Sequence, residues 1–324
     1  MKAICQDRYG SPDVLSLRDV TKPVPGDDEV LVRVRAASVN AYDWHYMRGD
    51  PLLPARMAFG LRGPRKAVRG RDFAGVVEAV GGDIDRFAVG DEVFGEADGT
   101  FAEFVCVPDD TVGAKPGNLT FEEAATLPLA AHTAVAGLRD RGEVKPGQTV
   151  LVIGASGGVG TFAVQYAAHL GAEVTGVCSA RNAEQVRAQG AAHVIDYTKE
   201  DFARGEHRYD VVLDLVGTRP IRVLRRAVAP GGTLVVGGGG KPGKLLGAAA
   251  LTLAAVVTAP FVRERVRPLT GPAPSREGLA RLKELAEAGV LRPVIERTYP
   301  LESAPDAIRY MENEHARGKL VVTI

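Results

Sequence analysis

The pattern of hydrophobic and polar positions changes about a third of the way along the chain. In the first part, residues 29–35 alternate apolar with polar side chains, as a half-buried strand does. The runs 74–80 and 101–107 look similar, and turns such as Val89-Gly90-Asp91 separate these runs. We therefore predict an all-β region here. Residues 52–69 are rich in proline, arginine and glycine without a clear period, so we expect a long loop or disordered flap there.

From about residue 121 the pattern becomes helical and then alternates between strands and helices. This alternation is typical of a doubly wound parallel sheet. A helix is expected from Ser275 to Gly289, and two final strands, 294–297 and 320–324, are expected to rejoin the first domain. The strand-like runs of the alternating part are Thr149–Ile153, 174–178, 193–195, 210–215 and 233–236. The sequence thus predicts an α/β fold with a β-rich domain and a doubly wound domain.

A glycine-rich turn directly follows the strand Thr149–Ile153 and precedes a helix expected over 161–170. Glycines let a phosphate approach bare backbone, and the helix N-terminus offers free N–H groups and a positive dipole end. The combination of strand, turn and helix predicts a dinucleotide site. Its expected ligand-facing positions are Gly154, Ser156, Gly157, Gly158 and Val159.

The residues after the second strand, 174–178, indicate which nicotinamide cofactor is bound. Glu173 precedes that strand, which places it at the amino end, away from the ligand edge of a parallel sheet. Ser179 and Arg181 follow the strand and suit an extra phosphate, so NADPH is favoured over NADH. Alternatively, Arg181 only opens the next helix on a solvated face. Tyr197 either closes over the adenosine side or is an ordinary surface residue.

Composition and charge restrict the class of partner and the compartment. The 324 residues include 40 basic and 40 acidic ones, so no overall field draws the protein to nucleic acid or to an anionic membrane. A small molecule is the expected partner. Cys5, Cys106 and Cys178 are an odd number and lie far apart, which argues against a disulfide framework or a cysteine zinc site. With polar residues soon after the N-terminus, a cytoplasmic location is expected.

One apolar segment, 245–262, has no charged residue and is just long enough to span a bilayer. A lone span there would divide one folded unit across a membrane. We therefore expect a helix that is buried against a substrate pocket or a subunit interface.

Several motifs, in this order, resemble the medium-chain dehydrogenase/reductase superfamily, and in particular its zinc-independent quinone oxidoreductase branch. The resemblance implies a GroES-like catalytic domain over 1–121 and 272–324, a Rossmann NADPH-binding domain over 122–271, and an active-site cleft between them. It also suggests a homodimer, with the edge of the nucleotide sheet and segment 245–262 as candidate interfaces. The motifs are Ala37-Ser38-Val39-Asn40 with Asp43, Gly70-Arg71-Asp72-Phe73-Ala74-Gly75-Val76-Val77, Val89-Gly90-Asp91-Glu92-Val93 and the glycine turn.

The resemblance places Asn40 and Asp43 near the nicotinamide, Thr133 at its carboxamide side and Gly237 among the cofactor-binding positions. Asn40 either donates to a ribose hydroxyl or substrate oxygen, or satisfies a loop carbonyl. Asp43 is expected to orient its loop.

His45 stands where some quinone reductases carry a tyrosine, and Tyr46 follows it. Either side chain is a candidate proton donor, with a loop histidine and a packed tyrosine as the alternative.

Zinc-dependent relatives carry a cysteine near residues 41–43 and a His-Glu pair where this chain has Arg71-Asp72. Without these ligands no zinc is expected. Hydride transfer from NADPH to a quinone or an activated C=C is then favoured, because the developing charge lies on an enolate or phenolate that modest donors stabilise. A zinc-free alcohol or carbonyl oxidoreductase, and a catalytically weak NADPH-binding sensor, are the alternatives.

Overall fold

The structure is a computed structural model that describes residues 1–238, 247–271, 273–314 and 316–324. The chain folds into two compact units. The first unit comprises Met1–Gly49, Ala55–His132 and Pro272–Ile324, and the second comprises Asp50–Pro54 and Thr133–Gly271. The main division follows His132. The domain bounds that the resemblance implies stay a prediction.

A seven-stranded sheet forms the centre of the first unit, beside a two-stranded sheet of β1 and β2. Its strand β3 (Glu29–Val39) pairs with three others. Val32 and Val34 of β3 are buried, whereas Arg33 and Arg35 are exposed, as predicted. Leu31 is buried as well as Val30, so the alternation does not extend over the first part of the run. The other strands of this unit are β1 (Lys2–Gln6), β2 (Leu15–Asp19), β4 (Asp72–Val80), β5 (Glu92–Glu96), β6 (Phe104–Pro108), β7 (Val112–Ala114), β14 (Ile295–Pro300) and β15 (Lys319–Thr323).

The two C-terminal strands complete this sheet, as predicted. β14 pairs in parallel with β15, and β15 pairs antiparallel with β3, where Leu320 lies opposite Val39. Both of these side chains belong to a buried cluster that also contains Ile4 and Trp44.

Helices surround the first sheet, and one of them corrects the sequence prediction. Residues 52–69 were expected to be a loop or flap, but helix α2 (Leu52–Phe59) occupies the first part. The Phe59 ring stacks on Tyr46 with 4.1 Å between ring centroids, a contact between distant residues that local composition does not reveal. The helices that lie wholly in this unit are α1 (Ala41–Arg48), α3 (Phe121–Ala124), α9 (Arg276–Glu287) and α10 (Ala304–Asn313). Both α2 and α4 (Pro128–Val135) cross the division between the units.

The second unit contains a six-stranded parallel sheet in the order β10-β9-β8-β11-β12-β13. This is the strand order of a Rossmann fold, so the doubly wound prediction is confirmed. The sixth strand, β13, was not predicted. The bounds are β8 (Thr149–Ile153), β9 (Glu173–Cys178), β10 (His193–Asp196), β11 (Tyr209–Asp214), β12 (Val228–Val236) and β13 (Arg265–Pro268).

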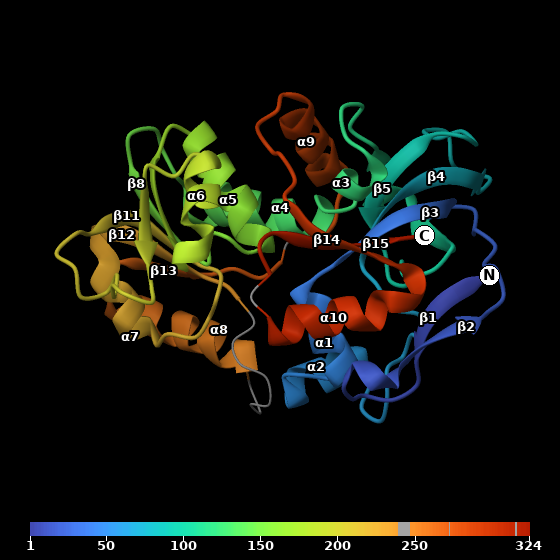
Figure 1. Cartoon of the computed structure of the whole chain (residues 1–324), viewed down its shortest axis with the longest axis horizontal. Coiled ribbons are helices and arrows are strands. Elements are labelled where there is room, and N and C mark those ends of the chain that lie inside the picture. The colour runs from blue at the N-terminus through green and yellow to red at the C-terminus, as the bar shows by residue number, and fades with distance from the viewer. Residues whose placement is uncertain (239–246, 272, 315) are drawn as a thin grey trace. The chain divides into compact units, whose positions relative to one another are not determined.

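Helices cover both faces of this sheet, with α5 and α6 on one face and α7 and α8 on the other (Figure 1). Among the described residues, no helix is long and apolar enough to cross a membrane. The apolar segment 245–262 contains α8, and its first two residues lie outside the described residues. The helix bounds are α5 (Gly158–His169), α6 (Ala183–Ala188), α7 (Ile221–Leu224) and α8 (Gly247–Thr258).

Candidate active site

The glycine turn lies at the ligand edge of the parallel sheet. Ligands of such sheets bind outside the carboxyl ends of the strands, where the strand order reverses. Here the order reverses between β8 and β11, and Ile153 at the end of β8 lies opposite Asp214 at the end of β11. The glycine turn begins with the next residue after Ile153, so it occupies the expected binding position.

Two of the turn's glycines are required by its geometry. Gly154 has a φ of +86°, and a Cβ added to Gly160 would lie 2.0 Å from the carbonyl oxygen of Gly154. Helix α5 begins at Gly158 rather than at Thr161 as predicted, because the Thr161 N–H donates to the Gly157 carbonyl and the glycines themselves form the first turn. The first N–H groups of α5 have no intrahelical acceptor and therefore suit a diphosphate.

The residues predicted to read the cofactor's adenosine side lie at this same edge. Ser179 and Arg181 follow β9, and Tyr197 follows β10. The Tyr197 N–H donates to the Cys178 carbonyl at 3.1 Å, which ties the ends of these two strands together. Arg181 is exposed, and the Tyr197 side chain is half exposed.

Glu173 lies at the opposite edge, as predicted. It is the first residue of β9, and its Oε1 atom lies 3.0 Å from Nε2 of His193, the first residue of β10. It is therefore remote from the glycine turn along the strand direction.

Two buried polar residues at the ligand edge escaped the sequence prediction. Asn182 is 2% exposed, and its Nδ2 donates to Oγ of Ser156 in the glycine turn at 2.9 Å. Asp214 is 1% exposed, and its Oδ1 accepts from the N–H groups of Val216 and Gly217. Burial raises the pKa of Asp214, although these two donors oppose the shift. In the sequence, only their positions point to these residues, because Asp214 ends the strand β11 and Asn182 follows the strand β9.

Gly237 and Thr133 both belong to the second unit. The Gly237 N–H donates to the Asp214 carbonyl at 2.8 Å, which places Gly237 at the same carboxyl edge. Thr133 is a half-buried residue of α4 and begins the long segment of this unit. Its predicted place at the carboxamide stays a prediction.

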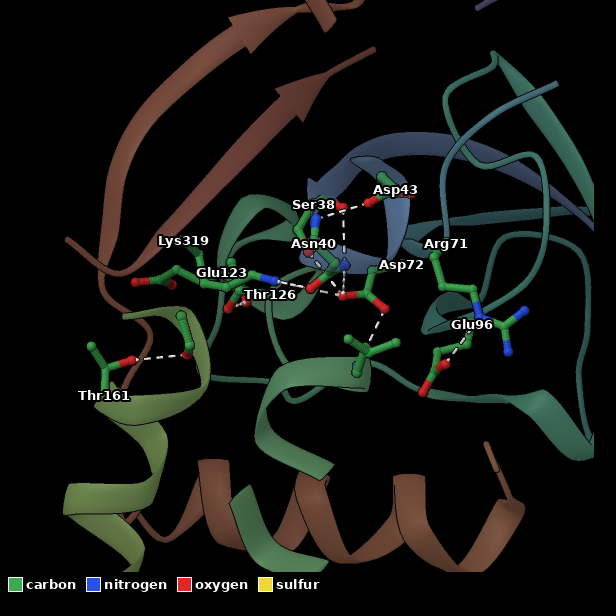
Figure 2. A network of polar contacts seen from close by, with 12 residues as sticks. Ser38, Asn40, Asp43, Arg71, Asp72, Glu96, Glu123, Thr126, Thr161 and Lys319 are labelled. Carbon is green, nitrogen blue, oxygen red and sulfur yellow. Dashed lines mark hydrogen bonds and ion pairs between the residues drawn. The ribbon is translucent and has the colours of Figure 1, made fainter. Parts of the chain in front are cut away.

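The first unit contains a buried network of polar side chains around Asp72 (Figure 2). Asp72 Oδ2 accepts from Ser38 Oγ and from Asn40 Nδ2, both at 2.9 Å. Asp72 Oδ1 accepts from the Leu129 N–H at 3.2 Å. Lys319 points into the network from β15, where its Nζ lies 2.5 Å from Asn40 Oδ1 and 3.9 Å from Asp72 Oδ2. The sequence prediction missed Lys319 entirely.

Both amide atoms of Asn40 therefore have partners inside this unit. Its oxygen accepts from Lys319, and its nitrogen donates to Asp72 and, at 3.3 Å, to the Ser38 carbonyl. Of the two roles considered for Asn40, this geometry favours the structural one. Asp43 accepts from the Asn40 N–H at 2.8 Å and so completes a capping box at the start of α1.

Burial shifts the proton affinities of this network towards neutral forms. The pKa of Asp43 rises to about 7 and that of Glu96 to about 8, in both cases chiefly because the carboxyl is buried. Burial also raises the pKa of Asp72 and lowers that of Lys319, while the attraction between these two opposite charges acts against both shifts.

The two candidate proton donors differ in their surroundings. Tyr46 is 4% exposed, with its ring between Phe59 and the Arg69 guanidinium, whose Cζ lies 3.5 Å from the ring centroid. This environment favours the packed role for Tyr46. His45 is half-buried and stacks on Trp44 with 3.7 Å between ring centroids, so it is the more accessible of the two.

Other protein groups already contact both side chains of the Arg71-Asp72 pair. The Arg71 guanidinium donates to Glu96 at 3.2 Å and to Asp98 at 3.0 Å. Asp72 already accepts three hydrogen bonds and faces the Lys319 ammonium. A divalent cation at Asp72 would have to displace these donors and meet a neighbouring positive charge.

Family comparisons agree with this architecture. Residues 26–117 match the alcohol dehydrogenase GroES-like domain, and residues 189–322 match a family described as zinc-binding dehydrogenase. The chain is 34% identical to the 2-methylene-furan-3-one reductase of Solanum lycopersicum, with 99% of this chain and 79% of the relative covered. It is also 34% identical to the chloroplastic NADPH-dependent alkenal/one oxidoreductase of Arabidopsis thaliana, with the same coverage.

A solved structure extends the similarity over both units. The quinone oxidoreductase of Escherichia coli, complexed with NADPH, superposes with a TM-score of 0.85 at 26% identity and covers 100% of both chains. The identity to the two reductases extends over nearly the whole chain, and the parallel sheet and GroES-like segment match the same group. The chain therefore belongs to the medium-chain dehydrogenase/reductase superfamily, alongside its quinone and alkenal oxidoreductases.

Proposed function

We propose that this protein is an NADPH-dependent oxidoreductase that transfers hydride to a quinone or to an activated C=C such as that of an enone. The observation that carries the proposal is the glycine turn at the strand-order reversal, with Ser179 and Arg181 at the same edge. The names of two similar proteins, an NADPH-dependent alkenal/one oxidoreductase and a quinone oxidoreductase complexed with NADPH, support the same reaction.

NADPH, when bound, supplies the hydride. The N–H groups at the start of α5 bind its diphosphate, and the Gly154 and Gly160 positions leave room for this approach. The Arg181 guanidinium and Ser179 hydroxyl bind the additional 2′-phosphate. His45 is the proposed proton donor to the reduced substrate, directly or through water.

Zinc independence is part of the proposal, and the donor set at Arg71-Asp72 supports it. A simple ketone needs a strong polariser for its developing alkoxide, which zinc supplies in metal-dependent relatives. An enone or quinone instead places charge on an enolate or phenolate oxygen, which hydrogen-bond donors stabilise. The expected substrates are therefore conjugated.

The decisive test compares the rates of NADPH oxidation with quinones, enones and simple ketones. The absorbance of the reduced nicotinamide reports each rate. Turnover should occur with the conjugated substrates and survive extensive chelation. Turnover confined to ketones, or activity that requires added zinc, would overturn the proposal. Tight NADPH binding without turnover of any substrate would instead indicate a sensor.

Replacing Arg181 tests the cofactor preference. A charge-assisted hydrogen bond contributes about 1.5–3 kcal/mol, so Arg181→Ala should weaken NADPH binding by about 10- to 100-fold and leave NADH binding nearly unchanged. Arg204→Ala is the matched control, because the Arg204 side chain is 85% exposed and lies outside the turns that follow β8 and β9. An equal loss of both cofactors in Arg181→Ala would contradict the phosphate assignment.

We also propose a homodimer that lies in the cytoplasm and binds neither nucleic acid nor membranes. A dimer is supported by the terminal position of β13 in its sheet and by exposed apolar side chains on α8 and just after it. The balanced charge and the three free cysteines support the remaining statements. Light scattering on the purified protein and on Val257→Asp, together with cell fractionation, tests the assembly and the location. The exposed side chains are Leu253, Val256, Val257 and Phe261.

A further inference from the structure

Two turns at the ligand edge are joined by one side-chain hydrogen bond. Ser156 lies in the glycine turn between β8 and α5, and Asn182 closes the short 3-10 turn Ala180–Asn182 that follows β9. Asn182 Nδ2 donates to Ser156 Oγ at 2.9 Å. The first turn is the proposed diphosphate site, and the second carries Arg181. Asn182 therefore contacts one phosphate-binding element while forming part of the other.

The direction of this hydrogen bond determines whether the Ser156 hydroxyl can still donate its proton to another group. A serine hydroxyl has one proton to donate and two lone pairs that accept. Because the Asn182 amide uses a lone pair, the hydroxyl proton stays available for a further acceptor. Phosphate oxygens are acceptors, so a hydroxyl held in this way is prepared to donate to them.

The burial of Asn182 gives a second, independent reason to assign it a function. The side chain is 2% exposed, and its Oδ1 has no hydrogen-bond partner among the described residues. A buried unsatisfied acceptor costs about 1–3 kcal/mol, and side chains that serve only the fold more often bond to backbone. Asn182 instead donates its hydrogen bond to a side-chain hydroxyl, that of Ser156 in the glycine turn.

We propose that Asn182 is a positioning residue that holds the Ser156 hydroxyl as a hydrogen-bond donor to the diphosphate of NADPH. This inference rests on the proposed NADPH-dependent function. Asn182 acts through Ser156, so it controls the affinity for the part of the cofactor that NADPH and NADH share. Arg181, one residue earlier, acts on the 2′-phosphate that only NADPH carries.

The test is a double-mutant cycle of Asn182→Ala and Ser156→Ala, with dissociation constants measured for NADPH and for NADH. Each single variant should weaken both cofactors by about 10-fold, since each removes one oriented donor. The double variant should also be weaker by about 10-fold rather than 100-fold, because Asn182 has no effect once the hydroxyl is absent. Asn182→Asp should bind both cofactors more weakly than Asn182→Ala does, because a carboxylate accepts the Ser156 proton and places negative charge beside the phosphates.

Two controls separate positioning from general stability. Asn118→Ala removes a comparable amide donor, which bonds to the Ala286 carbonyl at 2.9 Å in the first unit, and should leave both affinities unchanged. Thermal unfolding of every variant identifies any loss of fold, and Asn182→Asp preserves the shape of the side chain if Asn182→Ala is unstable.

Each outcome decides a different statement. A double variant that is about 100-fold weaker, or an Asn182→Ala variant that weakens NADPH alone, would overturn the positioning role and leave the cofactor assignment intact. Unchanged affinities in Asn182→Ala would do the same. A wild-type protein that binds neither cofactor would instead refute the proposed function itself.

Discussion

Replacing Lys319 by methionine removes the ammonium that faces Asp72 and Asn40 inside the first unit. Lys319 is 2% exposed and Asp72 is fully buried, so solvent cannot replace the lost partner. The variant leaves a buried carboxylate 3.9 Å from the former charge and an Asn40 oxygen without its donor. Two penalties therefore arise from a single substitution.

The size of the effect follows from the burial of the pair. Removal of one partner from a buried ion pair costs about 3–5 kcal/mol, a large part of the about 5–15 kcal/mol that stabilises a typical domain. Removal of both charges is far less costly, because no isolated charge stays buried. The double variant Lys319→Met with Asp72→Asn should therefore recover at least half of the lost stability.

Urea unfolding followed by tryptophan fluorescence measures this directly. The sequence has a single tryptophan, and Trp44 is 8% exposed in the same buried cluster as Leu320. Lys283→Met is the control, since its partner Glu287 lies one helical turn away on a partly exposed surface and such pairs contribute below about 1 kcal/mol. A Lys319→Met variant within about 1 kcal/mol of wild type, or a double variant no more stable than the single one, would refute the reasoning.

Two further substitutions test the site geometry. Gly160→Ala places a Cβ 2.0 Å from the Gly154 carbonyl oxygen, so it should lower the free energy of unfolding by about 1–3 kcal/mol and weaken NADPH binding. Gly271→Ala is the control, because a Cβ there would have no atom within 4 Å, and it should change neither quantity. Thermal unfolding and cofactor titration measure the two effects. Asp43→Asn removes a carboxyl whose pKa rises from 3.8 to about 7 in the folded protein. The folded state holds this proton more tightly, so the stabilising contribution is present at low pH and is lost as the pH rises through about 7. The free energy of unfolding of Asp43→Asn, relative to that of the wild type, should therefore increase between about pH 4 and pH 7. If urea unfolding gives the same difference between the two proteins at every pH, Asp43 does not titrate as a buried carboxyl.

The features that were predictable from the sequence are those that local pattern determines. The apolar run of β8 and the glycines after it have the residue types that a buried strand and a phosphate-binding turn require. The Asp72 position was also noticed, as part of a family motif and as a place where zinc ligands are missing. Its partners are distant in sequence, and only the folded sheet shows that they satisfy it.

The features that escaped prediction depend on contacts between distant segments. Lys319 precedes an apolar run and looks like an ordinary strand-end cation, yet the pairing of β15 with β3 brings it beside Asn40. Asn182 looks like a residue that opens a helix, and its burial against Ser156 arises from the packing of β9 beside β8. Helix α2 forms despite Pro54, because proline is tolerated in the first turn of a helix.

The central place of β15 affects how the chain is made. This strand lies between β14 and β3, yet it is synthesised after all the other strands that the structure describes. Until it arrives, the nascent first unit has an open β3 edge and an Asp72 without its cation, whereas every strand of the parallel sheet has already been synthesised. Loss of β15 should consequently act on the first unit as a folding defect.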